Sequence, residues 1–120
     1  MKKTIFAAAW FVLVLSFATA SAGDVKGLGT AACSEISDAW NGSDLDARSL
    51  YTVAIGQWAF GYLSGRNAEL PQSQRKELAS LDNDETAFFV LEQCKANPSY
   101  FVYQIVDVIF DAAPNASVGA

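Results

Sequence analysis

Residues Gly56 to Asn67 read GQWAFGYLSGRN, and no other stretch of the chain mixes glycine with large aromatic side chains so densely. A glycine inside a helix costs about 1 kcal/mol relative to alanine, which favours a structural reason for its presence. We expect this stretch to form the last turns of a central helix that other segments approach closely, with a helix end at Gly65. The predicted helix-packing residues are Gly56, Trp58, Phe60, Gly61, Tyr62 and Gly65.

The central helix is predicted to begin near Leu45 and to run to about Ser64, which makes it the longest in the protein. Asp44 and Asp46 suit the positive end of its dipole. Apolar residues cover nearly its whole circumference, as is typical of a helix buried on more than one side. Replacement of Gly61 by leucine should then destabilise the fold by overpacking.

Residues 1–22 have the features of a secretory signal peptide. Lys2 and Lys3 precede an apolar run from Ile5 to Phe17, and small residues follow up to Ala22. The run is shorter than the roughly 20 residues of a membrane-spanning helix, although an uncleaved N-terminal anchor is the alternative. We therefore expect a periplasmic or secreted domain over residues 23–120, with its core at about 31–113 and no stable membrane insertion after cleavage.

The mature chain is strongly acidic and lacks histidine. Loss of Lys2 and Lys3 leaves 6 basic residues against 13 acidic ones, a net charge of −7 (6 − 13). This charge argues against nucleic acid and anionic membranes as partners. The absence of histidine excludes histidine-based triads and histidine metal sites, and the mature chain has no glycine-rich phosphate loop. We expect no enzymatic activity, no metal and no cofactor.

Two cysteines remain in the mature chain, Cys33 and Cys94. In an exported protein an even number of cysteines predicts a disulfide. The bridge would close a separation of 61 residues (94 − 33), which contributes about 4 kcal/mol in the chain-entropy model. A metal or redox site is the alternative, but it is disfavoured because the chain has no Cys-x-x-Cys.

Three further helices complete a predicted all-α domain of four main helices. The first covers about 31–40, with Thr30 as its cap, and the third begins at about residue 84 and includes Cys94. The last covers about 99–112, after Asn97-Pro98; a strand is the competing prediction there because valine and isoleucine favour strands. Residues 68–81 are predicted to be a polar surface segment, with a short helix over 72–79.

Acidic residues cluster at the predicted helix starts, and Asp82 with Glu85 resembles a capping box. Helix starts are a better explanation of these carboxylates than catalysis. Their stabilising effect requires ionisation and is lost in acid. We therefore hypothesise that acid loosens the helices and exposes the surfaces of Trp58, Phe88 and Phe101, although any acidic protein loses stability in this way. The acid-titrating residues are Asp44, Asp46, Asp82, Asp84 and Glu85.

Two short motifs carry a family resemblance over roughly residues 32–113. Gly61-Tyr62-Leu63-Ser64-Gly65 and Cys94-Lys95-Ala96-Asn97-Pro98, after a signal peptide and an early cysteine, resemble the HdeA/HdeB-type family of small exported bacterial proteins. The pattern is also similar to the Rap/Tai-type immunity proteins of type VI secretion, which often have a further pair of cysteines. The first resemblance implies a periplasmic, disulfide-linked chaperone that exposes apolar surface in acid. The second implies a protein that binds one cognate toxin.

From these observations we expect a small non-enzymatic protein that binds acid-unfolded proteins through apolar surface. An immunity or inhibitor module for one partner is the alternative, and a homodimer is compatible with either. In the alternative an aromatic patch would bind the partner, whereas ordinary core packing is the simpler explanation of the same residues. The patch consists of Tyr51, Trp58, Tyr62, Tyr100 and Tyr103.

Overall fold

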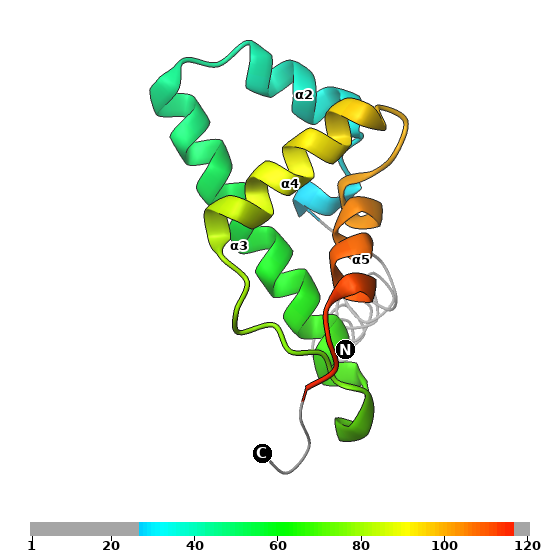
Figure 1. The fold of residues 1–120 in the computed structure, drawn as a ribbon. Helices are drawn as coiled ribbons and strands as arrows, with labels where there is room; N and C mark the ends of the chain where they lie inside the picture. The colour runs from blue at the N-terminus through cyan, green and yellow to red at the C-terminus, as the bar shows by residue number, and fades with distance from the viewer. Residues whose placement is uncertain (1–26, 117–120) are drawn as a thin grey trace, which may run out of the picture.

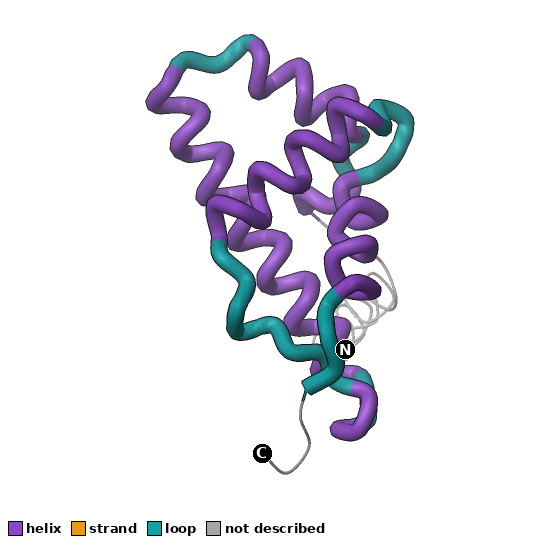
Figure 2. Tube along the Cα trace, in the orientation of Figure 1, coloured by secondary structure: helices purple, strands orange, loops and turns teal. Residues whose placement is uncertain are grey.

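The computed structural model describes residues 27–116; the predicted signal peptide at 1–22 lies outside this range. Within it the chain forms four α-helices and two short 3-10 helices, and no strand (Figures 1 and 2). The all-α prediction is therefore confirmed, and the last helix is not a strand. In chain order the elements are η1 (Gly27–Thr30), α2 (Cys33–Asn41), α3 (Leu45–Glu69), η2 (Gln72–Gln74), α4 (Asn83–Ala96) and α5 (Val102–Ala112).

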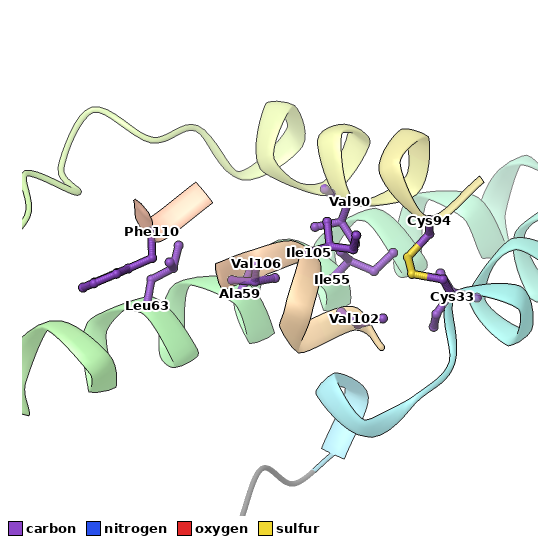
Figure 3. Packing of buried hydrophobic residues seen from close by; sticks show 12 residues of the cluster. Cys33, Ile55, Ala59, Leu63, Val90, Cys94, Val102, Ile105, Val106 and Phe110 are labelled. Atoms are coloured by element: carbon purple, nitrogen blue, oxygen red, sulfur yellow. A yellow bond between two sulfur atoms is a disulfide. The ribbon is translucent and has the colours of Figure 1, made fainter. Parts of the chain in front are cut away.

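The long helix α3 is the axis of the fold. Helices α4 and α5 both pack on α3, and α2 packs on α4 (Figure 1). Figure 3 shows the core as a row of side chains that extends from the Cys33–Cys94 disulfide to Leu63 and Phe110. The core residues of α3 recur at helical spacing along one face, so α3 is buried on this face rather than all round. They are Thr52, Ile55, Gly56, Ala59 and Leu63.

The predicted disulfide is present. Cys33 begins α2 and Cys94 lies in the last turns of α4, with 4.6 Å between their Cα atoms. Both side chains are fully buried in the core. Cys94 shares its face of α4 with Ala87 and Val90, as the sequence periodicity predicts.

Helix α3 does not end at Gly65 as predicted but continues to Glu69. Two contacts with distant segments stabilise the extra turn. Arg66 donates a hydrogen bond to Asp107 of α5, over 2.7 Å. The Asn67 side chain exchanges two hydrogen bonds with the backbone of Lys76, of 2.7 and 3.0 Å. Tertiary contacts therefore outweigh the local tendency of glycine to end a helix.

Helices α2 and α5 both begin later than predicted, because the residues before them pair with each other. The backbone N–H groups of Cys33 and Ser34 donate to the carbonyls of Tyr100 and Pro98, and the N–H of Val102 donates to Ala31. The N-cap of α2 is Ala32 rather than Thr30, which lies in η1. Pro98 lies in a turn that precedes α5.

The connection between α3 and α4 contains less helix than predicted. Only the short η2 forms, in place of a helix over 72–79. After η2, the backbone of residues 75–77 pairs with that of 114–116, through hydrogen bonds of 2.8 Å from Glu77 to Pro114 and from Ala116 to Arg75. Figure 2 shows this connection beside the segment that follows α5. None of the helices described in residues 27–116 has the length and apolar content of a membrane span.

Candidate functional site

Gly56 is the member of the predicted packing motif that another segment approaches closely. It is buried, and a Cβ atom there would overlap the side-chain amide of Asn83, the first residue of α4. That amide accepts a 3.0 Å hydrogen bond from Gln57 and donates one of 3.4 Å to the carbonyl of Thr52. The start of α4 therefore docks directly on the backbone of α3.

No segment packs closely on Gly61 or Gly65, so that part of the prediction is wrong. Both are exposed, and a Cβ atom at either position would have no neighbour within 4 Å. They lie on the side of α3 that carries Leu50 and Val53, which are 73% and 54% exposed. We call Leu50, Val53, Gln57, Gly61 and Gly65 the outer face of α3.

The aromatic residues of the motif lie on the sides of α3, between the outer face and the buried inner face that carries Gly56. Trp58 stacks on Tyr62 with 5.1 Å between ring centroids, and both pack partly buried against the core together with Phe60. Of the other residues in the predicted aromatic patch, Tyr103 stacks on Phe101 instead, at 6.0 Å. Tyr103 also lies near enough to Tyr62 to act on its pKa, so two ring pairs, Trp58–Tyr62 and Phe101–Tyr103, account for three of the five residues of the predicted patch.

A polar seam, consisting of Tyr62, Arg66 and Asp107, joins α3 to α5. The Tyr62 hydroxyl donates a 2.8 Å hydrogen bond to Asp107 Oδ1, which also forms the ion pair with Arg66. The Arg66 guanidinium lies 4.2 Å from the centroid of the Phe110 ring. Burial, together with the hydrogen bond to Asp107, raises the pKa of Tyr62 to about 12. The seam was missed in the sequence because its members are about 40 positions apart.

The predicted acidic residues lie at two helix starts. Asp44 caps α3 by accepting a hydrogen bond from Ala47 N, and Asp82 caps α4 by accepting one from Glu85 N. Asp46 lies in the first turn of α3, and Asp84 and Glu85 lie in that of α4. The Glu85 carboxylate takes no part in the α4 cap, so half of the expected capping box is missing.

Large apolar side chains are exposed in the folded chain in several places. Phe88 and Phe101, which we expected acid to uncover, are already 49% and 44% exposed. Trp58, by contrast, is partly buried. Within the part of the chain that the structure describes, the exposed large apolar residues are Leu45, Leu50, Tyr51, Val53, Phe88, Phe89, Tyr100, Phe101 and Val108.

Two of these residues, Phe89 and Val108, line a groove of about 450 Å³. The groove lies where the loop of residues 77–82 meets the first half of α4 and the end of α5. Its apolar wall includes Leu81, Phe89, Val108, Ile109, Ala112 and Pro114. The carboxylate residues Glu77, Asp82 and Glu85 also line it, whereas no lysine or arginine of residues 27–116 does. We call it the acid-lined groove.

The ionised side chain of Glu77 organises the loop beside the groove. It accepts hydrogen bonds from Ala79 N, over 2.7 Å, and from the Ser80 hydroxyl, over 2.8 Å. The Ser80 bond, with the backbone bonds, lowers the pKa of Glu77 below its usual value. The three-residue spacing of Glu77 and Ser80 is a local signal that sequence reasoning overlooked.

No group of three potential metal ligands comes together among residues 27–116. Comparison of the chain with family models, curated proteins and solved structures gives no match.

Proposed function

We propose that this chain is an exported, non-enzymatic protein that binds acid-unfolded proteins through apolar surface, as its resemblance to HdeA/HdeB-type chaperones implies. The observation that carries the proposal is the position of Glu77. This carboxylate holds the loop that borders the apolar wall of the acid-lined groove. Protonation removes the charge that Ala79 N and the Ser80 hydroxyl stabilise, so acid frees the loop and widens access to Leu81 and Phe89.

The seam between α3 and α5 supports the same proposal. Asp107 must be ionised to form the ion pair with Arg66, and it also accepts the Tyr62 hydrogen bond. Its protonation weakens the attachment of α5, whose inward face packs on Ala59 and Leu63 of α3. The Cys33–Cys94 bridge is unaffected by acid and keeps α2 joined to α4.

The test uses the oxidised chain of residues 23–120 and an acid-sensitive client protein. Both are incubated together at about pH 2.5, where carboxylates are protonated, and then neutralised while light scattering is recorded. We expect suppression of client aggregation, together with increased binding of a dye specific for apolar surface. Dye binding without client protection would mean that acid denatures the chain and does not activate it as a chaperone. No protection at about pH 2–3 would contradict the proposal.

An immunity or inhibitor module is the second candidate. It is favoured by the large apolar side chains that are exposed among residues 27–116, such as Leu50, Val53 and Phe88. Surfaces exposed before any acid treatment suit a partner that is bound by the native fold. The discriminating measurement is a complex of fixed stoichiometry at neutral pH, followed by size-exclusion chromatography with light scattering. Formation of such a complex with one toxin, without client protection in acid, would favour this candidate.

A further inference from the structure

The acid-lined groove combines an apolar wall with one sign of charge. Its volume of about 450 Å³ is in the range of about 300–1,000 Å³ that is usual for ligand pockets. Leu81, Ile109 and Pro114 contribute to the wall, and the exposed side chains of Phe89 and Val108 extend it to the surface. A partner that fills the groove must therefore present at least one large apolar side chain.

The carboxylates of the groove are not neutralised within the described chain. The Glu85 side chain forms no hydrogen bond or ion pair among residues 27–116, and Asp82 uses one oxygen to cap α4. The basic residues that lie nearest to these carboxylates in the sequence, Arg75 and Lys76, contact other groups. Arg75 donates to the carbonyl of Leu70, and the Lys76 ammonium lies 6.0 Å from the ring centroid of Phe110.

We propose that the acid-lined groove binds, at neutral pH, a basic amphipathic segment of a partner protein. One or two large apolar side chains of the segment lie against Phe89 and Val108, and neighbouring lysine or arginine side chains reach Glu85 and Asp82. The occupant is basic because, within residues 27–116, three carboxylate residues and no lysine or arginine line the groove. We take the occupant to be a protein segment because the groove opens between the first half of α4 and the end of α5, and amphipathic helices insert apolar side chains into apolar grooves of this kind.

This binding mode is independent of the acid-dependent activity proposed above. It requires ionised carboxylates and an intact loop at residues 77–82, whereas client binding in acid requires their loss. Either proposal can therefore fail without the other.

The probe is a peptide of three Lys-Leu-Leu-Lys repeats, labelled with an uncharged fluorophore and titrated with the chain of residues 23–120 at pH 7. Fluorescence anisotropy should report saturable one-to-one binding that weakens several-fold as salt increases from about 20 to 150 mM, because salt screens the charge pairs. A peptide of Glu-Leu-Leu-Glu repeats tests the charge, and one of Lys-Ala-Ala-Lys repeats tests the apolar contact. Neither should bind measurably.

Two matched variants locate the binding surface. Val108→Lys removes an apolar contact and places a cation beside the groove carboxylates, so the affinity for the probe should fall about tenfold or more. Val53→Lys makes the same change on the outer face of α3. Because Val53 and Val108 are 54% and 51% exposed, both variants should fold, which circular dichroism checks. Val53→Lys should change the affinity by less than about twofold.

Three results would overturn the proposal. The first is the absence of saturable binding by the Lys-Leu-Leu-Lys peptide. The second is equal binding of the Glu-Leu-Leu-Glu peptide, which would make the surface generally apolar rather than selective for cations. The third is an equal loss of affinity in the Val53→Lys variant, which would move binding away from the groove.

Discussion

The inner face of α3, which carries its buried residues, and the outer face are built from similar residues but have different surroundings. The inner face carries Ile55, Gly56 and Leu63, all buried beneath α4 or α5, whereas the outer face carries Leu50, Val53 and Gly61, all exposed. Each face thus contains leucine, a β-branched residue and glycine. The comparison teaches that apolar content around a helix does not by itself locate the core; the partners of each face decide it.

The largest difference between the faces is expected for leucine. Leu63→Ala should lower the free energy of unfolding by about 2–5 kcal/mol, because the side chain is buried and leaves a cavity. Leu50→Ala, which removes the same atoms from an exposed position, should change it by less than about 0.5 kcal/mol. Urea denaturation followed by circular dichroism measures both values. Similar losses in the two variants would mean that the outer face is covered in solution.

The glycines are expected to respond with opposite signs. Gly56→Ala places a methyl group where the Asn83 amide lies, and overpacking of this kind costs about 1–3 kcal/mol. Gly61→Ala meets no atom and improves helix propensity, so it should stabilise the fold by about 0.5–1 kcal/mol. The sequence-based expectation for Gly61→Leu is thereby reversed. A loss of stability at Gly61 as large as at Gly56 would contradict the open outer face.

The polar seam between α3 and α5 predicts a loss of stability at alkaline pH. The raised pKa of Tyr62 means that its neutral form stabilises the fold up to the ordinary tyrosine pKa of 10. This stabilisation is lost as pH rises through about 12. Absorbance titration at 295 nm should therefore show a late component from Tyr62 at about pH 12. In Tyr62→Phe the late component should be absent, and Asp107→Asn should shift it towards lower pH.

The smallest effect is expected at the loop beside the groove, where Glu77 is partly exposed to solvent. Because hydrogen bonds lower the pKa of Glu77, its carboxylate stabilises the fold above the ordinary glutamate pKa, and this stabilisation is lost as pH falls through the lowered value. Glu77→Gln should therefore lower the melting temperature slightly at pH 7 and leave it unchanged in strong acid. Ser80→Ala should give the same pattern, whereas an equal shift at both pH values would rule out the carboxylate as its origin.

The parts of the fold that local periodicity and composition control were predictable. Cys94, Val90 and Ala87 share a face at helical spacing, and Asp82 supplies a capping oxygen, so α4 and the disulfide followed from the sequence. The end of α3 did not, because Arg66 and Asn67 depend on partners at positions 107 and 76.

The acid-lined groove was also hidden in the sequence, for a similar reason. Its wall comes from a loop, from α4 and from the end of α5, whose side chains adjoin only after folding. The sequence around Val108 does not indicate that this side chain is exposed, because Val108 lies in an almost continuous apolar run. Predicting the groove requires the position of α5 on α3, which involves contacts far apart in the sequence, such as the ion pair between Arg66 and Asp107.

The Cys33–Cys94 bond also has a topological consequence. It turns α2, α3, the connection and α4 into a covalent ring, and it leaves α5 as a linear arm outside that ring. When α5 detaches from the other helices, no covalent bond breaks, and the disulfide still restricts the conformational freedom of the ring. We therefore expect the first partial opening of the oxidised chain to be departure of α5, with Ile55, Ala59 and Leu63 uncovered while the ring persists. Hydrogen exchange at α5 amides would report this opening at a lower free energy than exchange within α4.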